Sequence, residues 1–397
     1  MSVRRGLAAL SVAAVATVFL TACNSSVGAP SSDSTSTTGS DAQSPTSSPV
    51  TVSANVSGSA VAVDKVVRVS AQGGTLDKVS VTSDTGRLAG DLSANGVWVA
   101  KDRLEPGTTY VVKSVATTQD GATQRDRSRF STQDLTLEQQ TYASVAPLNG
   151  ETVGVGMPVI VTFDVPITDR AAIEKRMSVV STPAQKGSWH WMSGQEVHWR
   201  PKSYWKAGTD VVVDIDINSV AAGAGIYGQE SRKVSFHVGS ANVYKVNAQT
   251  HQMRVFSNGA LLRTLPITTG KPGFTTRSGV KVIIEKFDSK RMNSETVGIA
   301  RNSSEGYDLD NVKWAMRVTY SGEFIHGAPW SVGSQGYANV SHGCTGMSDA
   351  NARWLFSMSK RGDVVEYTGT DRPMTLTNGY GDWNASYSSY AAGSALR

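Results

Sequence analysis

A seven-residue stretch at positions 341–347, SHGCTGM, places a thiol close to an imidazole. In an extended segment the side chains of His342 and Cys344 point to the same face, because side chains alternate along a strand. His326 ends the upstream segment EFIHG, and pairing of the two strands would supply a second imidazole. A cysteine attacks a carbonyl as thiolate, so a neighbouring base has to activate it. The pattern predicts a cysteine nucleophile, with the backbone N–H groups of Gly343 and Cys344 as donors to an oxyanion.

Cys344 is one of 2 cysteines in the chain, and the other, Cys23, lies near the amino terminus. Arg4 and Arg5 precede an apolar run at 7–20 that leads into LTAC, which is typical of a secretory signal peptide at 1–22. The LTAC ending resembles the lipobox of bacterial lipoproteins, whose cysteine is diacylated; an ordinary cleaved signal is the alternative. A lipidated Cys23 leaves Cys344 without a disulfide partner. We therefore predict a lipid-anchored protein of the cell envelope, at the outer face of the cytoplasmic membrane.

Composition and charge narrow the class of protein. Residues 24–50 consist mainly of small and polar residues, so the segment 23–50 is predicted to be a lipidated, disordered tether. The formal net charge of +5 arises after residue 239, which suits a solvated surface or an acidic polymer substrate. The sequence has no stripe of interleaved Arg and aromatic residues, so no nucleic-acid partner is predicted. The sequence TTGKPG at 268–273 lacks the first glycine of a P-loop, which argues against nucleotide binding, and no cofactor is predicted.

A repeated pattern predicts two tandem immunoglobulin-like β-sandwiches, at 51–134 and 141–239. GVWVAKDRLEPGTTYVV and EVHWRPKSYWKAGTDVVV align so that Trp98 matches Trp199 and Gly107 matches Gly208. Both sandwiches are interpreted as spacers. Alternating Trp and His residues at 189–199 suggest either a sugar-binding strip or, as we prefer, a sandwich core and its rim.

The remaining chain is predicted to be a mostly β catalytic domain at 240–369, with one main helix in SDANARWLFSMSKRG. Ser348 is suited to begin this helix as its N-cap, and Gly362 is suited to end it. The segment 370–397 is rich in aromatic residues and glycine, and we expect it to pack on the catalytic domain as a C-terminal extension.

The chemical residues, taken with these elements, resemble a known family. HGAPWS and SHGCTGMSDANA are similar to the signature of the L,D-transpeptidases, the YkuD-type catalytic domain, in which a strand-end histidine precedes SHGC. TTGKPG, YSGEFIHGAPWS and GDWN at 381–384 extend the resemblance, and the layout resembles mycobacterial-type lipoproteins with two immunoglobulin-like domains. The resemblance implies a mainly β fold, with two sandwiches before a β-rich catalytic domain, and a cysteine acyltransferase.

The resemblance also implies a role for individual residues. Cys344 would be the acylated nucleophile, His326 the general base, and His342 a further catalytic residue that helps to hold the site. Residues implied to orient the site or serve the oxyanion are Gly343, Gly327 and Tyr307, and residues implied to bind substrate are Trp330, Met292, Ser341 and Gly346.

The implied reaction uses a tetrapeptide stem of peptidoglycan as donor. The thiolate attacks the carbonyl of the third residue, a diamino acid, and the terminal D-Ala leaves. The side-chain amine of a second stem then takes the acyl group and forms a 3→3 cross-link. Carbapenem β-lactams are implied as inhibitors that acylate the same cysteine.

Two positions depart from the family pattern and leave alternatives open. A serine is common where Gly327 stands, and an Asn or Arg is common where Gly346 stands, although the Gly327 carbonyl could still orient His326. The alternatives are an L,D-carboxypeptidase that uses water, an enzyme that anchors proteins to the wall, or a catalytically weakened wall-binding lipoprotein. A zinc site made of His326, His342 and Cys344 lacks any supporting motif, so no metal is predicted.

Overall fold

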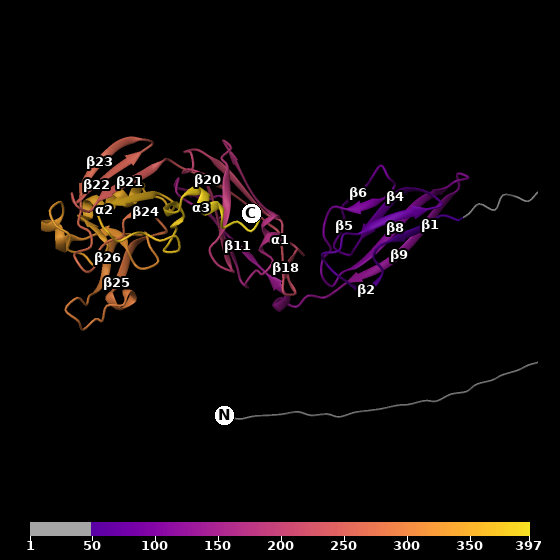
Figure 1. Cartoon of the computed structure of the whole chain (residues 1–397), viewed down its shortest axis with the longest axis horizontal. Coiled ribbons are helices and arrows are strands. Elements are labelled where there is room, and N and C mark those ends of the chain that lie inside the picture. The colour runs from indigo at the N-terminus through magenta and orange to yellow at the C-terminus, as the bar shows by residue number, and fades with distance from the viewer. Residues whose placement is uncertain (1–48) are drawn as a thin grey trace, which may run out of the picture. The chain divides into compact units, whose positions relative to one another are not determined.

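The computed structural model describes residues 49–397 (Figure 1). The predicted signal peptide, Cys23 and nearly all of the tether lie outside the described residues. The described part is mainly β, as predicted, and its helices are few and short. Within residues 49–397, no helix is long and apolar enough to cross a membrane.

The first sandwich packs two sheets around Trp98, Tyr110 and Phe130, all of which are buried. One sheet has the order β1 (Thr51–Ala54), β3 (Arg68–Gln72), β7 (Trp98–Ala100), β6 (Gly90–Leu92). The other has the order β2 (Gly58–Val61), β9 (Thr123–Thr132), β8 (Thr109–Thr118), β4 (Gly74–Thr82), β5 (Arg87–Leu88). Along β8, alternate residues from Tyr110 to Thr118 are buried and the residues between them are more exposed, which is the alternation that one buried face imposes.

The second sandwich repeats this arrangement. Its main sheets are β11 (Ala143–Ala146), β13 (Val159–Phe163), β16 (Glu196–Pro201), β15 (Gly187–Trp191), and β12 (Thr152–Val153), β20 (Arg232–Val238), β17 (Asp210–Ile215), β14 (Met177–Thr182). A small sheet of β10 (Gln140–Thr141), β19 (Ile226–Gly228) and β18 (Ala221–Gly223), with the short helices η1 (Leu137–Gln139) and α1 (Arg170–Glu174), completes it.

The matched residues of the two repeats occupy equivalent places. Trp98 and Trp199 are both buried, and Gly107 and Gly208 both turn the chain with positive φ, at 59° and 76°. The aromatic residues at 189–199 are core: Trp189, Trp191 and Trp199 are all buried, which contradicts a carbohydrate-binding strip.

The third part of the chain contains two sheets and one main helix. The first sheet has the order β23 (Ala260–Pro266), β22 (Gln252–Ser257), β21 (Asn242–Asn247), β29 (Val364–Thr368), β24 (Gly279–Val282), and the second β25 (Glu285–Asn293), β26 (Asp308–Arg317), β27 (Phe324–Gly327), β28 (Thr345–Met347). Helix α2 (Asp349–Met358) packs its Ala352 and Leu355 into the core that both sheets share. Short helices η2 (Ser294–Val297) and η3 (Pro329–Ser334) lie in the connections.

Helix α2 begins as predicted and ends earlier than predicted. The Ser348 hydroxyl accepts a hydrogen bond from the Asn351 N–H at 3.3 Å, so it is the N-cap. The helix stops at Met358 because Ser359 is extended and its hydroxyl donates to the Leu355 carbonyl at 2.6 Å. Gly362, with φ of 93°, shapes the following turn into β29 instead.

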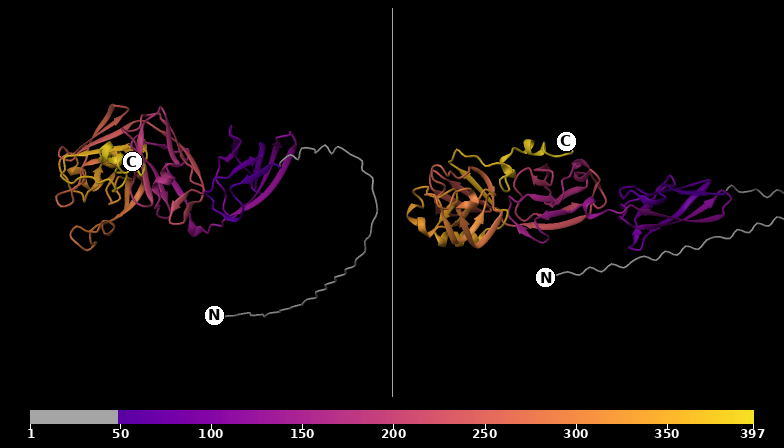
Figure 2. Two further views of the ribbon diagram at one scale, coloured as in Figure 1. Left: turned by 45° about the vertical axis from the view of Figure 1, so that its right-hand side comes forward. Right: turned by 90° about the horizontal axis from the view of Figure 1, so that it is seen from below.

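The C-terminal extension packs on two domains and not on the catalytic domain alone (Figure 2). On the catalytic side, the Asn384 side chain accepts from the Val280 N–H at 2.8 Å. On the second sandwich, η4 (Asp382–Asn384) and α3 (Tyr387–Ala391) cover Arg200, whose guanidinium lies 4.7 Å from the Trp383 ring centroid. The extension therefore contacts the catalytic domain, as predicted, and also the second sandwich, where its aromatic residues surround the buried Arg200 guanidinium.

A buried ion pair fastens the extension to the second sandwich. His198 is 2% exposed, and its Nδ1 and Nε2 lie 2.9 Å from Asp382 and 3.1 Å from Glu196. Burial alone would lower the pKa of His198, but these carboxylates outweigh it and raise the pKa to about 9. Imidazolium is therefore the folded form at neutral pH.

We predict that stability falls as this histidine loses its proton. Its folded pKa exceeds the unfolded value, so the stabilisation is complete below about pH 6.5 and is lost as pH rises through 9, by roughly 3 kcal/mol. Urea unfolding of the soluble chain at pH 6, 7.5 and 9 measures this change, and Asp382→Asn should flatten it. His237→Gln removes an exposed pair with Asp210 and is the matched control. An equal pH dependence in Asp382→Asn would contradict the assignment.

Candidate active site

A short parallel ladder positions the two residues that were predicted to do the chemistry. His326 lies on β27, and β28 begins at the residue after Cys344. The strands pair in parallel, with His326 opposite Gly346 and Ile325 opposite Thr345. Cys344 therefore lies at the mouth of the ladder, one residue before its first pair, with the imidazole on the neighbouring strand.

The predicted residues gather around one cavity of about 340 Å³. Those that line it are Met292, Tyr307, His326, Trp330, Ser341, His342, Cys344 and Gly346. Gly327 and Gly343 lie beside it in the chain without lining it. Sequence reasoning missed Thr268, Leu309, Ala328, Ser331 and Val340, which complete the wall. This volume is in the range of pockets that enclose a small molecule or a peptide segment.

His326 is buried, and its environment favours the neutral form. Nδ1 lies 2.7 Å from the carbonyl oxygen of Gly327, so Nδ1 carries the proton and Nε2 is the basic nitrogen. Burial lowers the pKa of His326 below 6.5, against weaker opposing effects of this carbonyl and of Asp349. The Trp330 ring stacks on the imidazole, with centroids 5.8 Å apart. His326 can therefore act as a base at neutral pH.

Cys344 is a protonated thiol at rest. Burial raises its pKa to about 11. Its sulfur lies 3.6 Å from the Gly322 carbonyl oxygen, a weak contact that the thiol can leave when a substrate enters. Attack by this sulfur on a carbonyl requires loss of the thiol proton. The neutral imidazole of His326, on β27, is suited to accept that proton.

The segment at 341–344 is a bend and not the extended strand that was predicted. Gly343 has φ of 123°, and its N–H donates to the Ser341 hydroxyl at 3.1 Å. The same hydroxyl donates to the Cys344 carbonyl at 2.6 Å. Ser341 thus shapes the loop, and the Gly343 N–H is engaged in this resting state instead of being free for an oxyanion. His342 and Cys344 still reach one cavity because the bend carries both to its rim.

His342 is held by partners that the sequence did not indicate. Its Nε2 lies 2.6 Å from Glu305, and the same carboxylate oxygen accepts from Lys271 at 2.6 Å. The ring contacts Phe274 edge-on and lies 5.1 Å from the centroid of Tyr307. Burial raises the pKa of Tyr307 to about 12, so its phenol stays protonated beside the cavity. These contacts orient His342 beside the cavity.

Comparison with known proteins decides the family. Residues 241–366 match the L,D-transpeptidase catalytic domain, and residues 58–221 match a bacterial Ig domain. L,D-transpeptidase 2 of Mycobacterium tuberculosis is 36% identical over 84% of this chain and 82% of its own length. The chain belongs to the L,D-transpeptidase family. L,D-transpeptidase 5 of the same species is 31% identical over 81% of this chain and 72% of its own.

A solved member of the L,D-transpeptidase family also superimposes on this chain. The structure of LD transpeptidase LdtMt1 in complex with imipenem covers 57% of this chain and 98% of its own, at 40% identity and a TM-score of 0.51. The family and the mainly β architecture predicted from the sequence are thereby confirmed.

At both positions that depart from the family pattern, Gly327 and Gly346, neighbouring side chains occupy the space that a larger residue would need. A Cβ at Gly327 would lie 2.2 Å from a carboxylate oxygen of Asp349, and a Cβ at Gly346 would lie 2.9 Å from the Ala328 Cβ and 3.1 Å from the Thr268 Cγ2. A larger residue at either place has to displace these neighbours. Both glycines are therefore matched to their surroundings.

We predict that Gly346→Ala lowers the free energy of unfolding by about 1–3 kcal/mol, because its methyl overlaps Ala328 and Thr268. Thr268→Ser in the same background should recover part of the loss, since it removes Cγ2 and keeps the hydroxyl that donates to Ala338. Gly333→Ala is the control, because a Cβ there meets open space. Denaturant titration measures all four proteins, and an undisturbed Gly346→Ala would show that the wall is looser than described.

Proposed function

We propose that this chain is a peptidoglycan L,D-transpeptidase that forms 3→3 cross-links through a cysteine acyl-enzyme. The observation that carries the proposal is the pairing of a buried, neutral His326 with the Cys344 thiol at one cavity. A base with a lowered pKa on β27 and a nucleophile directly before β28 are the two groups that acyl transfer needs.

In the first half-reaction, His326 takes the thiol proton as sulfur attacks the carbonyl of the diamino acid at the third position of a donor stem. The tetrahedral intermediate then collapses, the bond to D-Ala breaks, and the imidazolium returns the proton to the leaving amine. A thioester remains on Cys344. In the second half-reaction, the acceptor amine attacks the thioester carbonyl as His326 takes its proton. The C–S bond then breaks, and the imidazolium returns the proton to the sulfur of Cys344.

The cavity wall supports a peptide substrate. Trp330 is 58% exposed beside the buried imidazole, so its ring offers an apolar platform at the entrance. Met292 and Leu309 reach the same cavity from β25 and β26. Acylation by a carbapenem would use the same nucleophile and the same apolar wall. The similar protein LdtMt1 has been solved in complex with imipenem.

We predict that a carbapenem forms one covalent adduct on Cys344. Intact-protein mass spectrometry of the chain lacking residues 1–23 measures the adduct, which should be absent in Cys344→Ala. His326→Gln should slow acylation by about 10²–10⁴-fold, because it removes the base. An adduct of full yield in Cys344→Ala would disprove the nucleophile.

We also predict a pH dependence that reports on the base. Neutral His326 is the active form, and its pKa lies below 6.5. The acylation rate should therefore stay constant as the pH is lowered to 6.5 and should fall only at lower pH. Stopped-flow measurement of the acylation rate from pH 4.5 to 7.5 records this acidic decline. A midpoint above 6.5 would contradict a burial-lowered base.

Product analysis identifies the acceptor. Incubation with a tetrapeptide stem and a diamino-acid acceptor should yield a 3→3 dimer and free D-Ala. Release of a tripeptide alone would indicate an L,D-carboxypeptidase, and transfer to a protein amine would indicate anchoring.

We further propose that Cys23 carries lipid and holds the enzyme at the outer face of the cytoplasmic membrane. The support is the LTAC ending that follows an apolar run. Cys23→Ala should move the protein from the membrane to the soluble fraction and abolish incorporation of labelled palmitate. Unchanged membrane association and labelling would refute lipidation.

A further inference from the structure

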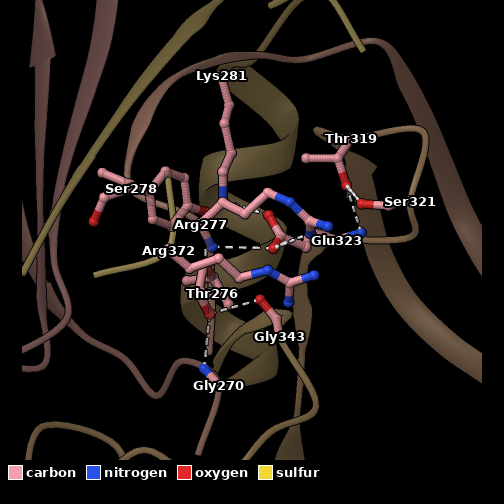
Figure 3. Close-up of polar contacts among 12 residues, drawn as sticks. Gly270, Thr276, Arg277, Ser278, Lys281, Thr319, Ser321, Glu323, Gly343 and Arg372 are labelled. Atoms are coloured by element: carbon pink, nitrogen blue, oxygen red, sulfur yellow. Dashed lines mark hydrogen bonds and ion pairs between the residues drawn. The ribbon is translucent and has the colours of Figure 1, made fainter. Parts of the chain in front are cut away.

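Three charged side chains form a cluster next to Gly343, the residue that precedes Cys344 (Figure 3). Glu323 stands immediately before β27, Lys281 lies on β24, and Arg277 lies in the loop before β24. One carboxylate oxygen of Glu323 accepts from the Lys281 Nζ at 2.5 Å, and the other lies 3.0 Å from the Arg277 guanidinium. The Arg277 backbone N–H donates to that second oxygen at 3.1 Å. The set holds two cations and one anion.

Such a set is costly to bury. The side chain of Lys281 is 0% exposed, that of Glu323 is 6% exposed and that of Arg277 is 16% exposed. Desolvation of buried charges often exceeds the gain from their pairing, and apolar replacements are frequently as stable. Stability alone therefore does not explain why these charges are buried, whereas their position next to Cys344 suggests a functional reason.

The cluster supports the residue that precedes the nucleophile. A Cβ at Gly343 would lie 3.6 Å from the Glu323 Cγ, so the carboxylate side chain runs against this turn. The hydroxyl of Thr276, next to Arg277 in the chain, donates to the Gly343 carbonyl at 2.8 Å and accepts from the Gly270 N–H at 2.8 Å.

The cluster also supports the residue that follows the nucleophile. The Lys281 Nζ lies 3.7 Å from the centroid of the Tyr367 ring. The Tyr367 hydroxyl in turn lies 2.7 Å from that of Thr345. The neighbours of Cys344 on both sides are thus connected to one buried ammonium and its carboxylate.

We propose that Lys281 is the buried counter-cation of Cys344, which stabilises the negative charge that forms on sulfur during acylation, while Glu323 and Arg277 hold it in place. Lys281 acts through space as a positioning and electrostatic residue, and Cys344 and His326 make and break the bonds. The proposal rests on the proposed nucleophilic role of Cys344.

The electrostatics of the two groups agree with this geometry. Burial raises the pKa of Cys344, the Glu323 carboxylate adds to the rise, and Lys281 opposes it. Burial lowers the pKa of Lys281 to about 8, although Glu323 and a thiolate at Cys344 act to raise it. The ammonium is therefore present at neutral pH and is lost as pH rises through about 8. The titratable or charged groups around the thiol are Glu323, Lys281, Arg277, His326, His342, Tyr307 and Tyr367.

The test compares two Lys→Met variants in the soluble chain lacking residues 1–23. Lys281→Met removes the ammonium and keeps an apolar stem. Lys286→Met, on β25, removes another partly buried ammonium, which donates to the Phe356 and Ser359 carbonyls. Carbapenem acylation and iodoacetamide alkylation of Cys344 are followed by mass spectrometry from pH 6 to 10, with circular dichroism to confirm the folded state.

We expect Lys281→Met to slow both reactions about tenfold at pH 7, the size of a change of one pKa unit at the thiol. Lys286→Met should stay within about twofold of the wild type. Wild-type acylation should also decline between pH 8 and 9.5, as Lys281 loses its proton, and Lys281→Met should lack this decline. A purely structural role would lower unfolding temperature without removing the alkaline decline.

Two results would overturn the counter-cation. One is a folded Lys281→Met protein that reacts at the wild-type rate. The other needs no variant: wild-type acylation that stays constant from pH 7 to 9.5. Absence of any carbapenem adduct on wild-type Cys344 would instead refute the proposed function, and the iodoacetamide rates would still decide the role of Lys281.

Discussion

The parallel pairing of β27 with β28 is the constraint on which the rest of the site depends. Register places His326 opposite Gly346, and the residue before the ladder is Cys344. Gly346 also exchanges backbone hydrogen bonds with Thr268, at 2.9 Å in both directions. Because this ladder is short, its position is fixed from both sides, by the loop at 268–276 and by helix α2 with its N-cap at Ser348. A shift of one residue would turn the imidazole away from the cavity.

Burial is the largest physical cause of the pKa shifts of His326 and Cys344. It lowers the pKa of His326, which makes the imidazole a base, and it raises the pKa of Cys344, which keeps the thiol protonated until that base acts. The same burial makes the thiolate costly, so a nearby cation has a large effect there. Lys281 lies where that effect is available, and Glu323 compensates for the cost of burying it. The wall that shelters the reaction thus also creates the need for a counter-charge.

The sequence was sufficient for the family, the mainly β architecture and most of the cavity, because these follow from short specific motifs and from alternation along strands. Other features required the structure. Gly343 adopts a bend that alternation cannot reveal, and Ser341 engages its N–H. Lys281 lies in the segment GVKVIIEKF, where alternation suggests an outward face; it is buried only because Glu323, distant in the chain, receives it. The docking of the extension on Arg200 was missed for the same reason, since both partners are far apart in sequence.

The departures at Gly327 and Gly346 bear on how the site selects its substrates. Their missing side chains leave no void, since Asp349 approaches the first and Ala328 with Thr268 the second. Orientation of the base survives at Gly327 because its carbonyl oxygen accepts the proton of Nδ1. At Gly346 the cavity wall is bare backbone beside the Ala328 methyl and the Thr268 Cγ2. For the proposed stem substrate, Gly346 supplies no side-chain hydrogen bond, so selection at this point of the wall rests on shape.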